Sequence, residues 1–195
     1  MAKLYFKYGA MGSSKTAQVL ITKFNYEERG MRVWLIKPAT DTRDGEDMLV
    51  SRIGLSSECT AIAEEESITA LFLEGHKDAD VIIADESQFF TPRQIDELRA
   101  IVDECSIPVL CFGLRTDFLT KLFSGSARLF EVADSISEIK TICACGAKAT
   151  VNARIGQNGK IVTHGHKIML GGNDRYIAMC HKCWRDRIKA EGDNV

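Results

Sequence analysis

The sequence lacks several features that would assign it to a class before any motif is considered. No apolar run in its 195 residues approaches the roughly 20 residues that a membrane-spanning helix needs, so no membrane anchor is expected. The first residues do not form the extended apolar segment of a signal peptide, which favours a cytoplasmic protein. No internal repeat or low-complexity tract occurs, so an ordinary globular fold is expected.

An excess of charge of one sign is also lacking. The 25 Lys and Arg residues nearly balance the 27 Asp and Glu residues, and the net charge is −2. A protein whose main task is to grip nucleic acid normally carries a basic excess, so no nucleic-acid partner is expected. The length and the 45% hydrophobic content fit a soluble enzyme with one main domain and a small appendage.

Apolar segments alternate with helical patterns through the first two thirds of the chain. Strands are predicted over 4–6, 33–36, 81–84 and 108–112, and helices over 15–29, 64–76 and 91–105. The polar segment 40–55 has weak periodicity and is interpreted as a mobile loop. Alternating strands and helices predict an α/β fold with a parallel sheet flanked by helices.

The character of the chain changes near residue 140, where two close cysteine pairs and short alternating runs begin. The pairs are Cys143 with Cys145 and Cys180 with Cys183. A cytosolic chain is not expected to form disulfides, whereas four thiolates make a closed tetrahedral zinc site. Residues 1–140 are therefore predicted to form the main domain, and residues 141–195 a β-rich module with structural zinc. Unpaired or redox-active thiols are the alternative.

A phosphate-binding loop is predicted between the first strand and the first helix. The segment Gly9-Ala10-Met11-Gly12-Ser13-Ser14-Lys15-Thr16 departs from G-x-x-x-x-G-K-[ST] at one position, where Ser14 replaces glycine. In this pattern backbone N–H groups surround phosphate oxygens, the lysine reaches the terminal phosphates and the hydroxyl binds Mg²⁺. Glycine is usual at that position when the backbone needs positive φ, so the effect of Ser14 depends on its φ.

An acidic pair follows the strand 81–84. Apolar residues that lead into Asp85 are typical of a Walker B strand, whose carboxylate helps to hold Mg²⁺ beside the phosphate loop. The next side chain, Glu86, points elsewhere and is available to act on a substrate hydroxyl. A solvated pair of acids is the alternative, which the preceding phosphate loop disfavours. Together the two motifs predict a P-loop (RecA-like) ATP-binding domain.

Two further segments complete a family resemblance. They are Gly113-Leu114-Arg115-Thr116-Asp117-Phe118 and Gly171-Gly172-Asn173-Asp174-Arg175-Tyr176. With the phosphate loop, the acidic pair and the cysteine pairs, they resemble the type II, zinc-containing thymidine kinases over about residues 4–184. The resemblance implies transfer of the ATP γ-phosphate to the 5′-hydroxyl of thymidine, a salvage reaction for DNA synthesis. It also implies a homotetramer inhibited by thymidine triphosphate, and leaves the preference for thymidine over deoxyuridine open.

The resemblance also implies residue roles. Glu86 matches the catalytic base, and the loop 9–16, Asp85 and Gln88 match positions that bind ATP and Mg²⁺. Asp41 and Arg43 resemble an element near the phosphates. The positions implied to contact the nucleoside are Met11, Phe89, Leu114, Phe118, Met169, Gly171 and Tyr176. Core packing is the alternative for each aromatic residue taken singly.

Two rival functions have to be weighed. Asp-Glu-x-Gln after a strand also occurs in helicase-type ATPases, but such motors need a second α/β domain and a basic track. Ser14 raises the other alternative, a nucleotide-binding regulator that has lost its activity. The presence of Lys15, Thr16, Asp85 and Glu86 disfavours such a loss.

Overall fold

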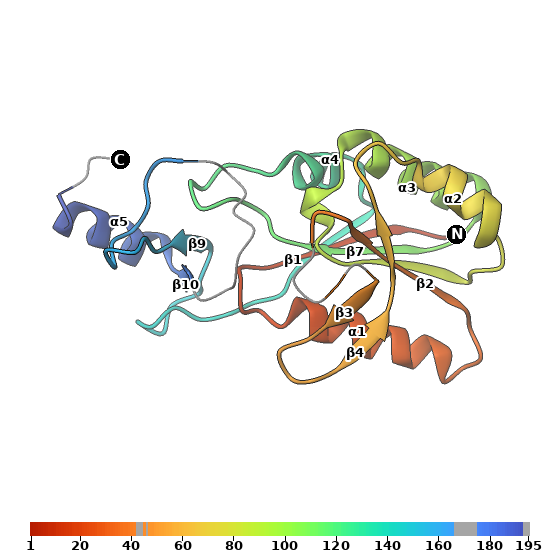
Figure 1. The fold of residues 1–195 in the computed structure, drawn as a ribbon, viewed down its shortest axis with the longest axis horizontal. Coiled ribbons are helices and arrows are strands. Elements are labelled where there is room, and N and C mark those ends of the chain that lie inside the picture. Colours follow the sequence, from red (N-terminus) through yellow and green to blue (C-terminus); the bar gives the residue numbers. More distant parts are fainter. Residues whose placement is uncertain (42–44, 46, 166–174, 193–195) are drawn as a thin grey trace.

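The computed structural model describes residues 1–41, 45, 47–165 and 175–192. Figure 1 shows a sheet between helices and a smaller C-terminal unit beside it. In chain order the elements are β1 (Leu4–Tyr8), α1 (Lys15–Glu27), β2 (Val33–Pro38), β3 (Met48–Val50), β4 (Ser56–Glu58), β5 (Thr60–Ile62), α2 (Ile68–Gly75), β6 (Val81–Ala84), the 3₁₀ turn η1 (Ser87–Phe89), α3 (Pro92–Cys105), β7 (Val109–Gly113), α4 (Ser124–Val132), β8 (Ser135–Glu138), β9 (Val151–Arg154), β10 (Tyr176–Met179) and α5 (His181–Ala190).

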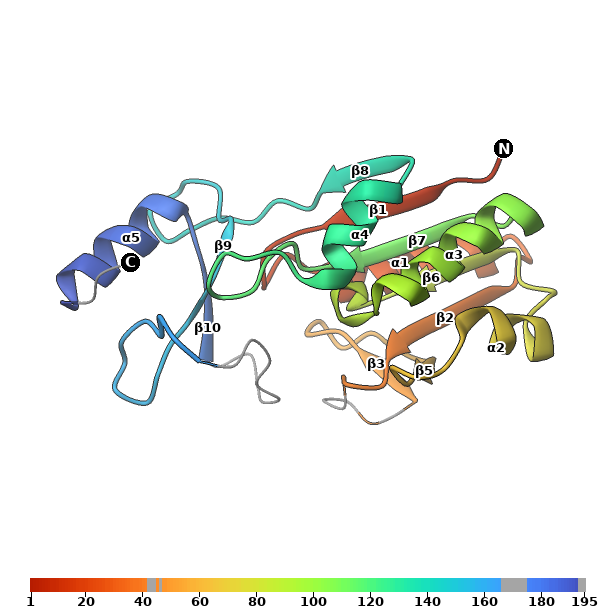
Figure 2. The same cartoon turned by 90° about the horizontal axis from the view of Figure 1, so that it is seen from above.

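The core is a six-stranded sheet in the order β5-β2-β6-β7-β1-β8, which can be followed in Figure 2. Every neighbouring pair of these strands is parallel, as the alternating sequence pattern predicts. Helix α1 covers one face, and α2, α3 and α4 cover the other. Because side chains alternate along a strand, Ile83 packs toward Val19 of α1, whereas Ile82 packs toward Leu98 of α3. Because these strands are parallel, the carboxyl ends of β1, β6 and β7 meet at one edge of the sheet.

The start of α3 confirms the sequence prediction and the start of α2 corrects one. Thr91 caps α3 with Pro92 in the first turn. Helix α2 begins at Ile68, because Ser67 is its N-cap and accepts a hydrogen bond from the Ala70 N–H. Residues 64–66 instead form a turn whose backbone carbonyls accept hydrogen bonds from the Arg93 guanidinium. The prediction that this helix starts at residue 64 was wrong.

The segment 40–55 is more ordered than a loop over its described residues. Strand β3 pairs with β4 in an antiparallel hairpin, and Leu49 is buried in the core on the α1 side. The buried Lys37 of β2 anchors this hairpin, since its ammonium group donates to the Gly45 carbonyl at 2.7 Å and the Met48 carbonyl at 2.8 Å. A strand of three residues is too short to produce a readable period.

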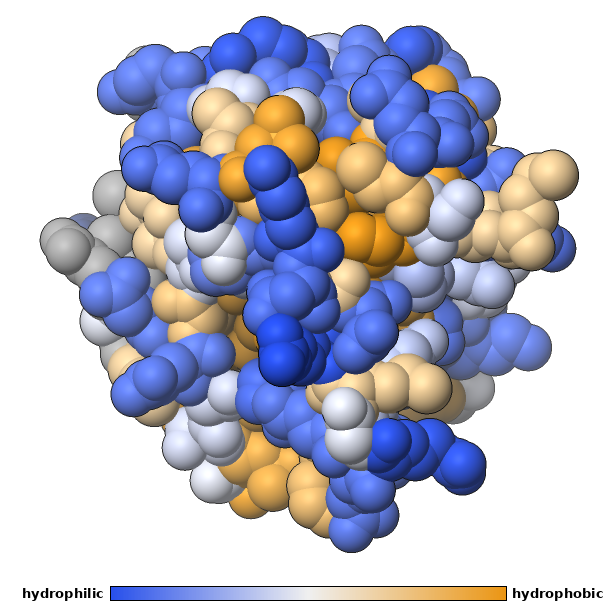
Figure 3. Space-filling model, turned by 90° about the vertical axis from the view of Figure 1, so that its right-hand side faces the viewer, coloured by the Kyte–Doolittle hydropathy of each residue, from blue (hydrophilic) through white to orange (hydrophobic). Residues whose placement is uncertain are grey.

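The C-terminal unit lies beyond the carboxyl edge of the sheet (Figures 1 and 2). Strands β9 and β10 pair antiparallel, and α5 packs on them around a separate apolar cluster that includes Val151, Trp184 and Ile188. The molecular surface at the end opposite the C-terminal unit is mainly hydrophilic with small apolar areas (Figure 3). Among the described residues, no helix combines the length and the hydrophobicity that crossing a membrane requires.

Candidate active site

The loop between β1 and α1 has the tight backbone of a phosphate-binding turn. Gly12 and Ser14 both have positive φ, at 74° and 60°. A Cβ at Gly9 would lie 2.6 Å from the Ile139 carbonyl oxygen, so this position requires glycine. Ser14 is the N-cap of α1, yet its side chain makes no capping hydrogen bond. The position therefore has the backbone for which glycine is usual, and a non-glycine residue there costs roughly 1–2 kcal/mol.

The Lys15 side chain folds back onto this loop. Its ammonium group donates to the Ala10 carbonyl at 3.0 Å and lies 3.4 Å from the Ser13 hydroxyl. The residue is only 8% exposed. The cation thus lies within the loop, and its contact with the terminal phosphates stays a prediction.

Asp85 meets the phosphate loop across the sheet edge. The Thr16 hydroxyl donates to Asp85 Oδ2 at 2.8 Å, although β7 separates the strands that carry the two motifs. Asp85 is fully buried, and its Oδ1 has no hydrogen-bond partner among the described residues. A hydroxyl beside a carboxylate with an unused oxygen is a donor set that suits Mg²⁺.

Burial raises the pKa of Asp85 to about 7, and the neighbouring Glu86 charge adds to this, against the Thr16 hydrogen bond. The folded pKa therefore lies above the unfolded value of 3.8, and the folded state binds more protons between these two values. The stabilising contribution is complete below the unfolded pKa and is lost as pH rises through the folded pKa. Asp85 is thus a source of instability at alkaline pH.

The free energy of unfolding in Mg²⁺-free buffer should show this loss. Between pH 5 and pH 8 the Asp85 contribution should fall by roughly 3 kcal/mol. Asp85→Asn, which can still accept the Thr16 hydrogen bond, should flatten this part of the pH dependence. Urea unfolding of both proteins at several pH values measures it, with zinc left in place. If the free energy of unfolding varied with pH in the same way in both proteins, the raised pKa of Asp85 would be contradicted.

Glu86 diverges from Asp85 because its backbone is left-handed, with φ 47° and ψ 33°. Its carboxylate accepts a hydrogen bond from the Gln88 side-chain amide in η1. The two carboxylates therefore point in different directions, that of Asp85 toward Thr16 and that of Glu86 toward η1. This divergence matches the sequence expectation, and such backbone strain concentrates at functional sites.

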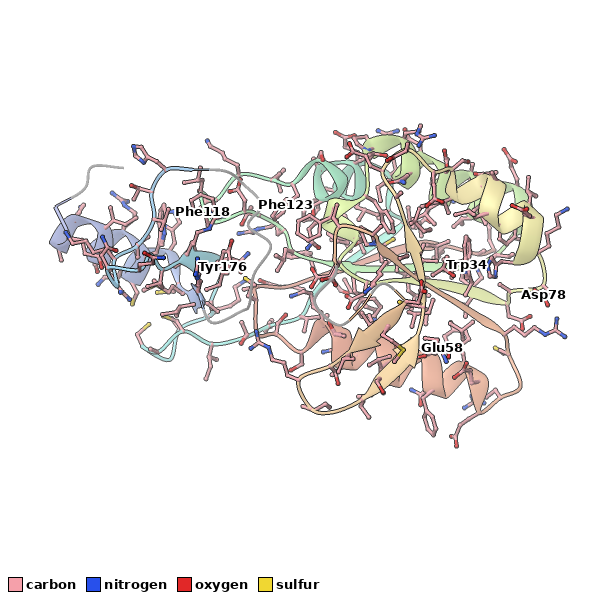
Figure 4. The ribbon with its side chains drawn as sticks, in the orientation of Figure 1. Trp34, Glu58, Asp78, Phe118, Phe123 and Tyr176 are labelled. Atoms are coloured by element: carbon pink, nitrogen blue, oxygen red, sulfur yellow. The ribbon has the colours of Figure 1, made fainter. Side chains whose placement is uncertain are left out.

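Several described residues that are predicted to contact the nucleoside lie near the same edge. Phe89 packs edge-on against Phe123, with ring centroids 5.5 Å apart, and Leu114 directly follows β7. Phe118 and Tyr176 lie together toward the C-terminal unit (Figure 4). Asp41 is buried just after β2. Arg43, Met169 and Gly171 lie outside the described residues.

Two polar residues of β9 reach this site and were missed by the sequence analysis. Asn152 accepts from the Met11 N–H and donates to the Thr116 carbonyl, both at 2.8 Å. The Arg154 guanidinium lies 3.7 Å from the Phe118 ring centroid and donates from Nε to the Tyr176 hydroxyl at 2.9 Å. Their two-residue spacing in a buried strand was the available signal, because it places both on one face.

The four cysteines of the C-terminal unit converge as predicted. Their sulfur atoms all lie within 4.8 Å of one another, and those of Cys145 and Cys180 are 3.7 Å apart. Tetrahedral Zn–S bonds of about 2.3 Å require sulfur separations of about 3.8 Å. Backbone hydrogen bonds from Cys145 and Cys180 lower the pKa of Cys143 to about 6. Hydrogen bonds with the Cys145 and Cys180 thiols raise the pKa of Cys183, and a bound dication would favour all four thiolates. The cluster fits structural zinc.

Similarity to solved structures is low. A Bacteroides Pif1 helicase bound to single-stranded DNA aligns with a TM-score of 0.40 and 18% identity, over 70% of this chain and 38% of the helicase. A Pif1 helicase from Candida albicans aligns with a TM-score of 0.44 and 14% identity, over 72% of this chain and 36% of the helicase. The chain thus spans less than half the length of these helicases, and likeness at this level carries no functional argument.

Sequence relatives are far more similar. A profile of the thymidine kinase family matches residues 2–184. The thymidine kinase of Zymomonas mobilis is 43% identical over 192 residues, which cover 97% of this chain and 100% of the relative. The thymidine kinase of enterobacteria phage T4 is 42% identical over 194 residues, which cover 98% of this chain and 100% of the relative. Matches of this extent, over the same residues that build the site, show that the chain belongs to the thymidine kinase family.

Proposed function

We propose that this protein transfers the γ-phosphate of ATP to the 5′-hydroxyl of thymidine, giving thymidine monophosphate and ADP. The observation that carries the proposal is the convergence at one sheet edge of the loop 9–16, the Thr16–Asp85 pair and Glu86. Aromatic and apolar groups suited to a flat pyrimidine, such as Phe89 and Phe118, border this edge. Phosphoryl transfer requires mainly this positioning and charge neutralisation.

In the proposed reaction the oxygen of the thymidine 5′-hydroxyl attacks the γ-phosphorus, and Glu86 takes the proton that this hydroxyl loses. A bond forms between that oxygen and phosphorus, and the bond to the β-phosphate bridging oxygen breaks to release ADP. Lys15 and the backbone N–H groups of the loop stabilise the phosphate charge. Thr16 and Asp85 would hold Mg²⁺, which supplies further charge neutralisation when bound.

A coupled assay of ADP formation tests this function. We expect turnover that requires both Mg²⁺ and thymidine, with thymidine monophosphate as the product. Turnover stimulated by single-stranded DNA without thymidine would identify a motor instead. Nucleotide binding without any turnover would support the regulator, which nothing in the comparisons favours.

Ser14→Gly should stabilise the protein and strengthen ATP binding. Glycine adopts positive φ without the Cβ clash, and against its greater freedom in the unfolded chain we expect a net gain of about 1 kcal/mol. For a chain of this size that gain raises Tm by about 2–4 °C. We also expect a severalfold lower KM for ATP, because the relaxed loop can adjust to the phosphates.

Ser106→Gly is the matched control for this substitution. Ser106 is also left-handed, with φ 58°, but it ends α3 on the exposed surface away from the phosphate loop. It should raise Tm by a similar amount and leave the KM for ATP unchanged. Equal kinetic effects of the two variants would contradict a role of Ser14 in nucleotide binding.

Assembly, regulation and location form the remaining part of the proposal. We infer a homotetramer, since Ile21 and Phe24 lie exposed on α1 and Ile136 lies exposed on the edge strand β8. We also propose feedback inhibition by thymidine triphosphate, because it contains the same nucleoside as the substrate and is the end product of its phosphorylation.

Free thiols and a four-cysteine cluster suit a reducing cytoplasm, which is the location that we propose. The separate apolar cluster of the C-terminal unit supports a division between 1–140 and 141–195.

A further inference from the structure

The side-chain amide of Gln88 is engaged at both ends. Its Oε1 accepts a hydrogen bond from the Leu114 N–H at 2.9 Å, and its Nε2 donates to Glu86 Oε2. A backbone N–H can only donate and a carboxylate can only accept, so the amide has a single orientation. Gln88 is 1% exposed, and its oxygen, the amide atom able to bind Mg²⁺, faces Leu114.

The backbone around Gln88 is built to hold this amide in place. The Ser87 hydroxyl donates to the Phe112 carbonyl of β7 at 2.8 Å. A Cβ at Gly113 would lie 2.7 Å from Gln88 Oε1, so the end of β7 admits the amide only because residue 113 is glycine. On the other side, a Cβ at Gly125 of α4 would lie 2.5 Å from the Phe90 carbonyl oxygen. The turn η1 is therefore clamped between β7 and α4.

This clamp leaves the Glu86 carboxylate with a defined partner on a strained backbone. Glu86 is left-handed, a conformation that persists only when its surroundings determine it. The same amide connects Glu86 to Leu114, which the proposed function places beside the base. One side chain thus contacts both the proposed proton acceptor and the backbone of the proposed nucleoside pocket.

We propose that Gln88 is the positioning residue for Glu86 and that it binds neither ATP nor Mg²⁺ directly. This inference rests on the proposed kinase activity and assigns Gln88 differently from the family resemblance. It acts through Glu86, by orienting the carboxylate toward the 5′-hydroxyl. A displacement of a catalytic group by about 1 Å can lower the rate by about 10²-fold.

Gln88→Met tests the inference, because methionine has a similar size and lacks both polar atoms. We expect kcat to fall by about 30- to 100-fold, with the KM for ATP and the Mg²⁺ half-saturation within threefold of wild type. Gln94→Met is the matched control. Gln94 is also 1% exposed and uses its amide on backbone groups, but in the cap of α3. It should lower Tm comparably and keep kcat within twofold.

Gln88→Glu provides a second test in case the methionine variant fails to fold. Its carboxylate can still accept from the Leu114 N–H but presents an acceptor to Glu86, so kcat should again fall at least tenfold. A kcat within threefold of wild type in either variant overturns the inference. A loss that saturating ATP or Mg²⁺ restores also overturns it, because Gln88 would then act on the nucleotide. A wild-type protein without thymidine-dependent turnover would instead refute the proposed function.

Discussion

Glu86→Gln should lower kcat for thymidine phosphorylation by about 10²-fold or more, the usual contribution of a general base. The amide has the shape of the carboxylate but cannot accept the 5′-hydroxyl proton at neutral pH. Because the change leaves Lys15, Thr16 and Asp85 intact, we expect the KM for ATP to stay within a few-fold of wild type. Steady-state kinetics with both substrates varied separate the two effects.

The matched control is Glu74→Gln, on the exposed surface of α2. This variant should retain wild-type kcat and both KM values. If Glu86→Gln kept turnover within about threefold of wild type, another group would have to accept the proton. The left-handed backbone at residue 86 would then need a different explanation.

Removal of the zinc site should abolish activity almost completely. Structural zinc would contribute on the order of 10 kcal/mol to the folding of a small module, and Cys145→Ser removes one of the four thiols that would hold it. The loss should reach the active site because β9 carries Asn152, which bonds the phosphate loop at Met11, and Arg154, which packs on Phe118. We expect kcat/KM for thymidine to fall by more than about 10²-fold.

Metal analysis should find one zinc per chain in the wild-type protein and much less in Cys145→Ser. Cys105→Ser, which changes an exposed cysteine at the end of α3, is the control and should retain both zinc and activity. Circular dichroism should show that the sheet domain stays folded in the zinc-depleted variant. Full activity in a zinc-free protein would refute the coupling between the module and the site.

Much of the fold follows from local sequence patterns. The continuous apolar run of β6 and the cap of α3 each depend on residues adjacent in the chain, so their predictions hold. Short or tertiary-dependent elements do not follow in this way. Strand β3 needs the buried Lys37 to anchor it, and the turn before α2 needs carbonyl contacts with Arg93, about 30 residues away.

The chemistry divides along the same line. The residue types and their order can be read along the chain: a lysine and a threonine after a glycine loop, an acid pair after a strand, and two cysteine pairs. These are local, because chain neighbours supply each motif. Three other features became visible only in the folded chain: the positive φ of Ser14, the direction of the Gln88 amide, and the contact of Asn152 with Met11, 141 positions away along the chain. Such features depend on packing between distant segments, which no local pattern encodes.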